Sequence, residues 1–368
     1  MKQVRDGYKQ TKVGIIPQDW GVVKIGNVLK IGSGKDYKHL EDGDIPVYGT
    51  GGYMLSVNKY LYNGESVCIG RKGTINKPML LNEKFWTVDT LFYTHCFRNS
   101  IPKYIYLVFL RINWKKYNEG SSIPSLSKTT IESILIALPP LNEQEIIAEI
   151  LTTWDNAIIK QQELIKSKEE QKKGLMQKLL SGEVRFDGFS DEWKFIKLGD
   201  LLDYEQPTQY LVSDTSYSDE YKTPVLTAGK TFILGYTNET DGIFTRDLPV
   251  IIFDDFTTAN KFVDFPFKAK SSAMKILKPK NKSVNIKLIY EIMQMINFVA
   301  DDHKRYWISE YQELDIKLPS KEEQKKIAEV LSLADEEIKN LKNELKEQKQ
   351  QKKALMQKLL TGQVRVKV

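Results

Sequence analysis

A repeat of 49 residues is the feature that most constrains how this chain folds. Residues 138–186 and 318–366 align at a constant offset of 180 without a gap, and 23 of the 49 positions are identical. Residues 20–29 also correspond to residues 193–202, at an offset of 173. Between these matches, residues 30–137 and 203–317 show little similarity. The chain is therefore predicted to hold two copies of one design, each a variable segment followed by a repeated segment.

Both repeated segments have the pattern of a long helix with a single apolar seam. The seam residues alternate spacings of four and three, which is the heptad pattern of a coiled coil. From Asn142 to Gly182 such a helix would be about 60 Å long. One stripe on so long a helix requires a partner, and the nearest candidate is the other copy. The predicted apolar seam consists of Ile147, Leu151, Trp154, Ile158, Ile165, Leu175 and Leu179 in the first copy, and Ile327, Leu331, Ile338, Leu341, Leu345, Leu355 and Leu359 in the second.

Polar residues interrupt the seam at Gln161, Lys168, Lys172, Gln348 and Lys352, where we expect them to fix the register at some cost in stability. The sequences Leu-Pro-Pro and Leu-Pro-Ser join each helix closely to the segment before it. We therefore expect the helices to set the distance between two domains. A simple dimerisation coiled coil is the alternative interpretation.

The two variable segments read as mixed α and β structure. In the first, strands are expected at Ser66–Ile69 and Thr87–Phe97 and a helix at Pro102–Tyr117; in the second, a strand at Leu248–Phe253 and a helix at Asn285–Val299. The predicted fold class is α+β, with variable domains at 1–141 and 187–319 and long helices within 142–186 and 320–368.

Charge is unequal between the variable segments. The chain has a net charge of +6, but residues 1–141 carry 19 basic against 11 acidic residues, whereas residues 187–320 carry 16 against 21. The first domain is thus a plausible binder of a polyanion, and the second as a whole is not. Seven lysines cluster late in the second domain, and we hypothesise that they form a basic face. They are Lys268, Lys270, Lys275, Lys278, Lys280, Lys282 and Lys287.

Motifs for catalysis or for resident cofactors are not found. Gly32-Ser-Gly-Lys35 has Leu29 and Asp36 where a Walker loop needs glycine and Ser/Thr. Two cysteines and three histidines match no zinc or disulfide spacing. The polar N-terminus resembles no signal peptide, and no apolar run approaches the ~18 residues of a membrane span. We expect a cytoplasmic protein without membrane contact and without its own metal or cofactor.

A glycine-flanked basic turn at residues 70–73 (GRKG) is the best candidate for binding DNA. Glycines let the backbone approach a base or phosphate, arginine can bind guanine through two hydrogen bonds, and lysine can neutralise a phosphate. A solvated basic turn is the alternative. The full set of candidate DNA-binding residues is Thr50, Arg71, Lys72, Thr74, Asn76 and Lys77 in the first domain, and Lys230, Thr231, Thr257, Lys261, Lys270, Lys304 and Arg305 in the second.

Taken together, these motifs resemble the specificity subunit of type I restriction–modification enzymes. The resemblance covers essentially the whole chain and rests on residues 69–74 (IGRKGT), 85–90 (FWTVDT), 123–127 (IPSLS) and 138–144 (LPPLNEQ), with the twin QKK and LMQKLL endings. The second domain departs from the pattern, because Phe253-Asp-Asp-Phe256 stands where the first has Ile-Gly-Arg-Lys-Gly.

The resemblance implies a non-catalytic subunit in which each domain reads one half of a gapped, bipartite DNA sequence. The two helices would pack antiparallel as a pseudo-twofold repeat, set the gap and dock two methyltransferase subunits. S-adenosylmethionine, ATP and Mg would be bound by the methyltransferase subunits and by separate motor and nuclease (restriction) subunits. Two alternatives are the recognition subunit of a type IIB-like enzyme and a coiled-coil scaffold without DNA contact.

Overall fold

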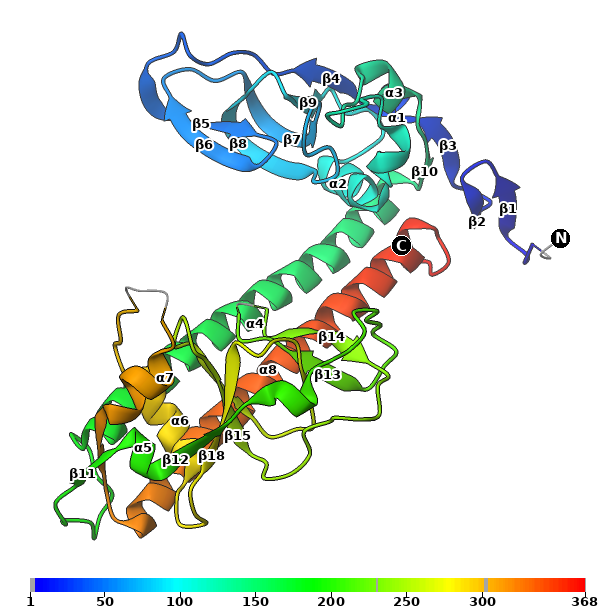
Figure 1. Cartoon of the computed structure of the whole chain (residues 1–368). Helices are drawn as coiled ribbons and strands as arrows, with labels where there is room; N and C mark the ends of the chain where they lie inside the picture. The colour runs from blue at the N-terminus through cyan, green and yellow to red at the C-terminus, as the bar shows by residue number, and fades with distance from the viewer. Residues whose placement is uncertain (1–3, 230, 301–303, 368) are drawn as a thin grey trace. The chain divides into compact units, whose positions relative to one another are not determined.

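The computed structural model describes residues 4–229, 231–300 and 304–367. The chain divides into two compact units (Figure 1). Unit 1 consists of residues 1–163 with 343–368, and unit 2 of residues 164–342. The last segment of the chain therefore belongs to the same unit as the first.

Two long helices run through both units. Helix α4 spans Leu141–Ser181 and helix α8 spans Lys321–Leu360, each about 60 Å long at ~1.5 Å per residue. In unit 2 the Nζ atom of Lys168 lies 2.6 Å from a carboxylate oxygen of Glu337, and Lys172 lies 2.7 Å from Asp335. Partner numbers fall along α8 as they rise along α4, so the helices pack antiparallel, as expected.

The same arrangement holds for the helical segments of unit 1. Lys352 forms an ion pair with Asp155, and the Gln161 side-chain amide donates to Glu344 over 3.2 Å. Four of the five predicted polar seam positions therefore make cross-helix contacts. The fourteen predicted apolar seam residues are all buried or half-buried.

Unit 1 holds a six-stranded sheet in the order β4-β9-β7-β8-β5-β6. Helix α2 packs on β7 and β8 (Figure 1). The hydrophobic core that includes α2 also contains Ile147 of α4 and Leu359 of α8. Two small pairs, β1-β2 and β3-β10, complete the unit. The elements are β1 Tyr8–Thr11, β2 Gly14–Pro17, β3 Gly21–Lys24, α1 Ile25–Val28, β4 Lys30–Ser33, β5 Asp42–Gly49, β6 Gly52–Val57, β7 Tyr62–Gly70, β8 Met79–Thr87, β9 Leu91–His95, α2 Pro102–Arg111, η1 Trp114–Tyr117, α3 Lys128–Ser133 and β10 Leu135–Leu138.

Unit 2 holds a four-stranded sheet in the order β12-β18-β15-β16, a three-stranded sheet in the order β14-β13-β17, and the pair β11-β19. Its elements are β11 Lys194–Lys197, α5 Leu198–Leu201, β12 Leu202–Glu205, η2 Pro207–Tyr210, β13 Thr223–Leu226, β14 Ile233–Thr237, β15 Val250–Asp254, β16 Asn260–Val263, β17 Lys268–Ala269, β18 Met274–Pro279, α6 Ile286–Met295, α7 Tyr306–Ser309, η3 Tyr311–Glu313 and β19 Asp315–Leu318.

One scaffold underlies both units although their sequences differ. The order β4-β9-β7-β8 in unit 1 matches β12-β18-β15-β16 in unit 2, and α2 and α6 are both ten residues long. The pairs β3-β10 and β11-β19 occupy positions that correspond at the repeat offsets of 173 and 180. The similarity between the halves therefore extends through segments in which the sequence shows almost none.

The two remaining predicted strands end within one residue of the expected position, at Gly70 and Asp254, but three predicted elements end two or more residues away from it. The strand expected over Thr87–Phe97 is interrupted after Thr87 by a turn, and it ends at His95 because Cys96 has a φ of 53°. The helix expected to reach Tyr117 ends at Arg111, and Trp114 starts a separate 3-10 turn. Helix α6 spans Ile286–Met295, so the expected end at Val299 is wrong.

The basic face hypothesised for unit 2 is contradicted. Strand β18 carries two of the seven lysines, Lys275 and Lys278, and pairs antiparallel with β12, which carries two acidic residues. Lys278 lies 2.6 Å from Glu205 and Lys268 lies 2.7 Å from Glu239. Lys275, Lys280 and Lys287 also form ion pairs, with Asp255, Asp203 and Glu291. Charges that are far apart in the sequence neutralise each other across the sheet and on the helices.

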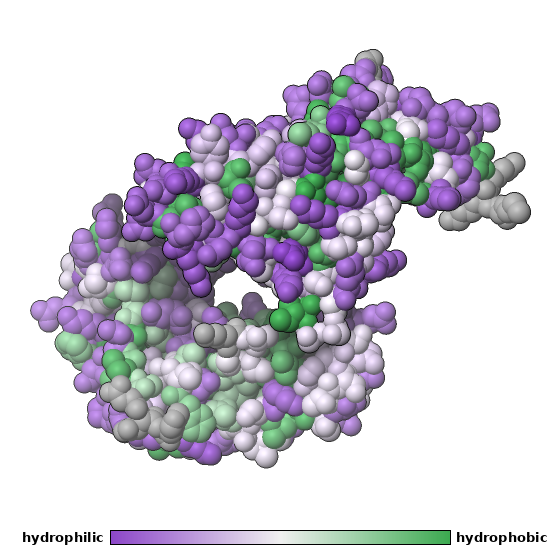
Figure 2. Space-filling model, turned by 90° about the horizontal axis from the view of Figure 1, so that it is seen from above, coloured by the Kyte–Doolittle hydropathy of each residue, from purple (hydrophilic) through white to green (hydrophobic). Residues whose placement is uncertain are grey.

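Hydrophilic residues predominate over the face of the molecule shown in Figure 2, and hydrophobic residues form small separate areas on it. Among the residues that the structure describes, no helix has the length and apolarity needed to cross a membrane.

Candidate nucleic-acid interface

The candidate site of unit 1 is built on the arginine loop, residues 70–74, which follows β7. Gly70 admits no side chain, because a Cβ there would lie 2.1 Å from the carbonyl oxygen of Thr74. Gly73 has a φ of +85°, a left-handed conformation that favours glycine. The two glycines of the sequence motif are thus required by the shape of the loop.

Backbone hydrogen bonds hold this loop between two other segments. The Arg71 N–H donates to the Thr90 carbonyl over 2.7 Å, and the Arg71 carbonyl accepts from the Leu126 N–H over 2.9 Å. The Gly73 N–H donates to the Pro124 carbonyl over 2.8 Å. Three motifs that the sequence separates by up to 50 residues, 69–74, 85–90 and 123–127, therefore meet at one place.

The side chains of Arg71 and Lys72 are exposed and free to contact a ligand. Within the described residues neither forms an ion pair; the Arg71 guanidinium only approaches the carbonyl of Asp89, at 3.4 Å. They line a cavity of about 380 Å³ together with Lys128, whose Nζ lies 5.9 Å from the ring centre of Phe92. Three cations on one surface suit a phosphate backbone.

A carboxylate, Glu119, lines the same cavity. It accepts hydrogen bonds from the hydroxyls of Thr130 and of Ser127, the latter at 2.8 Å, and these bonds lower the pKa of Glu119. The side chain is fixed and negatively charged, so it offers an acceptor to an exocyclic amino group of a base. No motif in the sequence marks Glu119, whereas Lys128 directly follows the 123–127 motif.

The other candidates of unit 1 lie near the loop. A Cβ at Gly73 would lie 3.8 Å from the Thr50 hydroxyl, so Thr50 is beside the arginine loop. Thr74 is half-buried at its end, and Asn76 and Lys77 are exposed in the segment that leads to β8.

Unit 2 has a loop at the equivalent place, residues 254–259 between β15 and β16, which we term the phenylalanine loop. The Asp255 N–H donates to the Ala273 carbonyl over 3.3 Å, and the Asp255 carbonyl accepts from the Tyr306 N–H over 2.9 Å. The two acceptor and donor residues also correspond to those of unit 1. Ala273 directly precedes β18 as Thr90 directly precedes the matching strand β9, and Tyr306 lies 180 positions after Leu126, which is the repeat offset. Asp255 thus stands where Arg71 stands in unit 1, and Phe256 stands where Lys72 stands.

The candidates of unit 2 are more scattered. Thr257 lies on the phenylalanine loop, and Lys304 and Arg305 directly precede Tyr306; all three are exposed, and Lys304 forms an ion pair with Glu310. Lys261 is exposed on β16. Thr231 and Lys270 lie next to the three-stranded sheet. The Thr231 carbonyl accepts a hydrogen bond from the Thr227 hydroxyl, and the Lys270 N–H donates to the Leu226 carbonyl. Lys230 lies outside the described residues.

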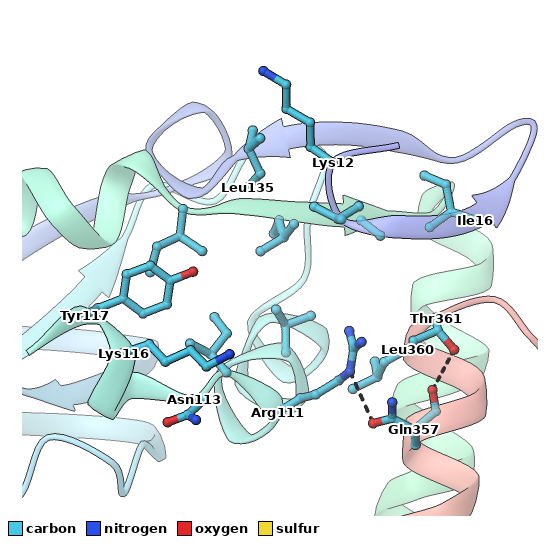
Figure 3. Close-up of a pocket in the computed structure, with 16 residues that line it drawn as sticks. Lys12, Ile16, Arg111, Asn113, Lys116, Tyr117, Leu135, Gln357, Leu360 and Thr361 are labelled. Atoms are coloured by element: carbon cyan, nitrogen blue, oxygen red, sulfur yellow. Dashed lines mark hydrogen bonds between the residues drawn. The ribbon is translucent and has the colours of Figure 1, made fainter. Parts of the chain in front are cut away.

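A larger cavity of about 550 Å³ lies elsewhere in unit 1, between the β1-β2 hairpin, α2, β10 and the end of α8 (Figure 3). Lys12, Arg111 and Lys116 line it, and Arg111 donates to the Gln357 side chain over 3.4 Å. Its described lining includes no carboxylate and none of the candidate DNA-binding residues. It is therefore separate from the arginine loop, and its charge suits an anionic group.

A single scaffold that presents two unlike exposed loops on a coiled-coil frame defines a protein with two different recognition sites. A family model described as "Type I restriction modification DNA specificity domain" matches residues 17–167 and again residues 190–349. Because these matches cover most of the chain, the chain belongs to this family. The double match supports the DNA-recognition interpretation over a scaffold without DNA contact and over a type IIB-like subunit.

Named relatives agree with this assignment. The chain is 54% identical over 142 residues to the specificity subunit of the type I restriction enzyme EcoR124I/EcoR124II of Escherichia coli, a match that spans 37% of this chain and 34% of that protein. It is 25% identical to the MjaVIII specificity subunit of Methanocaldococcus jannaschii, over 96% and 94% of the two chains. The crystal structure of a type I restriction–modification S subunit from M. genitalium has the same fold, with a TM-score of 0.63, 16% identity and 97% coverage of both chains.

Proposed function

We propose that this chain is the DNA-recognition subunit of a type I restriction–modification complex. The arginine loop of unit 1 reads one half of a gapped target, and the phenylalanine loop of unit 2 reads the other. The observation that carries the proposal is the duplicated loop support: the same backbone hydrogen bonds hold Arg71 in one unit and Asp255 in the other, with different side chains presented beside them. One support with two chemistries is what a protein needs to read two unlike half-sites.

The long helices set the spacing between the half-sites and dock two methyltransferase subunits. Support for this comes from the length of α4 and α8 and from their cross-helix ion pairs, which fix one register. A rod of about 60 Å is long enough to hold two readers one DNA turn (~34–36 Å) or more apart.

The chain itself is non-catalytic in this proposal, and it works in the cytoplasm. Methyltransferase subunits bind S-adenosylmethionine and modify adenine, and restriction subunits use ATP and Mg. In the described residues, no group of three or more His, Cys, Asp or Glu side chains is placed to hold a metal ion. Partner subunits also supply part of the phosphate neutralisation that a chain with a net charge of +6 leaves incomplete.

Sequencing of methylated bases in a host that carries the complete system tests the proposal. We expect one bipartite motif with a fixed gap, and loss of that motif when the gene for this chain is deleted. An ungapped motif, or methylation that persists without this chain, would contradict the proposal.

A further inference from the structure

The phenylalanine loop poses a problem for a DNA-reading unit, because it contains two aspartates where unit 1 has a basic turn. Both aspartates are engaged within the protein. The Asp254 carboxylate accepts from the N–H groups of Phe256, at 2.9 Å, and Thr257, at 3.1 Å. The Asp254 carboxylate therefore stabilises the backbone conformation of the loop.

Asp255 is removed from the surface altogether. It is only 3% exposed, lies 3.2 Å from the Nζ atom of buried Lys275, and accepts from the Trp307 N–H over 3.0 Å. In unit 1 the residue at this place, Arg71, points outward. The recognition chemistry of the unit 2 loop thus passes to the residues that follow Asp255.

Phe256 is the first of these residues and is exposed. Of its surface 39% is open to solvent, and among the described residues it belongs to no hydrophobic cluster and has no ring partner. Thr257 beside it is also exposed, and Thr258 has a φ of 58°, a conformation that a β-branched residue adopts at a cost. The fold gains little from an exposed phenyl ring at this position.

We infer that Phe256 reads the 5-methyl group of a thymine in the half-site bound by unit 2. Apolar side chains such as Phe discriminate thymine in the major groove through this methyl group, which none of the other three standard DNA bases carries. Arg305 is exposed and directly precedes Tyr306, whose N–H donates to the carbonyl of Asp255 in the loop. Arg305 is therefore placed to bind a neighbouring phosphate. Unit 1 would thus read its half-site by hydrogen bonds and charge, and unit 2 would read part of its half-site by apolar contact.

This inference rests on the proposed DNA-recognition function, and its test separates the two. The full chain, in complex with its methyltransferase subunit, is used to select bound duplexes from a randomised library. The half-site of unit 1 is assigned as the one that changes in the Arg71→Ala variant. Each thymine of the other half-site is then replaced singly by deoxyuridine, which removes only the methyl group.

We expect one of these replacements to weaken binding by the wild-type complex about fourfold, the effect of hiding one methyl-sized group from water. The Phe256→Ala variant should bind the thymine duplex about as weakly and should not respond further to deoxyuridine. Phe195→Ala is the matched control, because Phe195 is another exposed phenylalanine of unit 2, at 66%, on strand β11. It should keep the wild-type response.

Equal binding of all deoxyuridine duplexes by the wild type would overturn the inference, and so would a Phe256→Ala variant that keeps the thymine preference. Reduced assembly with the methyltransferase subunit at an unchanged thymine preference would make Phe256 a protein contact and also overturn it. If the wild-type complex selects no gapped sequence at all, the proposed function fails instead.

Discussion

Arg365, near the C-terminus, is bound to the buried carboxylate of Glu143 in unit 1, and this contact allows a quantitative prediction. Glu143 is 1% exposed and accepts from Arg365 through Nε at 2.7 Å and Nη2 at 2.9 Å, and from the Trp20 indole at 2.9 Å. Arg365 also forms two hydrogen bonds of 2.9 Å with Asp19. The perturbation is Arg365→Ala, which leaves the Glu143 carboxylate with only the indole donor.

The expected loss follows from the burial of Glu143. Breaking a buried ion pair by removing one partner costs about 3–5 kcal/mol, because the other charge stays buried. The Arg365 side chain is 37% exposed, so water can enter and replace part of its contribution. We therefore expect unit 1 to lose about 2–3 kcal/mol of unfolding free energy. Adding Glu143→Gln should restore part of this loss, since the double variant buries no unpaired charge.

Hydrogen exchange of the full chain measures this loss separately in each unit. Arg365→Ala should speed exchange in the core of unit 1 and leave unit 2 unchanged. Arg185→Ala is the matched control, because Arg185 makes the equivalent bonds to Glu323 within unit 2, at 2.9 and 2.8 Å. Equal destabilisation of both units by either variant, or a double variant less stable than Arg365→Ala alone, would refute the reasoning.

Three further predictions concern recognition, pH and spacing. Arg71→Ala should relax one position of one half-site by about 1–3 kcal/mol, whereas Lys72→Ala should weaken binding to all sequences and reduce the salt dependence; binding titrations at several salt concentrations distinguish them. Burial opposes ionisation of Asp335, but hydrogen bonds from Lys172 and Lys287 outweigh it and lower its pKa below 3.8. Its contribution to the stability of unit 2 should be present above about pH 4 and be lost as the pH falls through the lowered pKa, a loss that Asp335→Asn should lack in acid unfolding experiments. One heptad inserted into both α4 and α8 adds about 10.5 Å of helix, so the methylated motif should gain about three base pairs in its gap. Binding should also weaken, because about three added base pairs rotate one half-site relative to the other by about a third of a turn. Methylome sequencing measures the gap, and an unchanged gap would contradict the spacer role.

The long helices were predictable because their contacts are local and periodic. Heptad spacing identified the seam residues from Ile147 to Leu359, and the repeat identified each helix as the partner of the other. The helix boundaries differ from the predicted segments by a few residues, with α4 ending at Ser181 and α8 at Leu360. Periodicity locates a helix well but does not locate its ends, which depend on tertiary contacts.

The shared scaffold of the variable domains was not predictable from this sequence. Its strand order depends on pairings between distant segments, such as Asp203 with Lys278, which no local pattern reveals. The same pairings explain why the predicted basic face of unit 2 was wrong: a count along the sequence cannot show which charges neutralise each other across a sheet. The shape of the arginine loop was predictable because its glycines are required locally. Phe256 was not among the candidates from the sequence, because an exposed phenylalanine has no signature outside its fold.

The long helices and the segments next to them repeat their sequence, whereas the variable domains repeat only their fold. The contacts that stabilise these two parts of the chain differ, and this difference explains the contrast. The recognition loops are held by main-chain groups, such as the N–H and carbonyl of Arg71 and of Asp255, which almost any residue supplies. The frame is held by side chains: Arg185 with Glu323, and Arg365 with Glu143, are the same two repeat positions paired twice. Substitution is therefore costly in the frame and inexpensive at exposed loop positions such as Lys72 and Phe256, whereas Gly70, Gly73, Asp254 and Asp255 are required by the loops themselves. Under the proposed function, such a chain can change what it reads without changing how it folds.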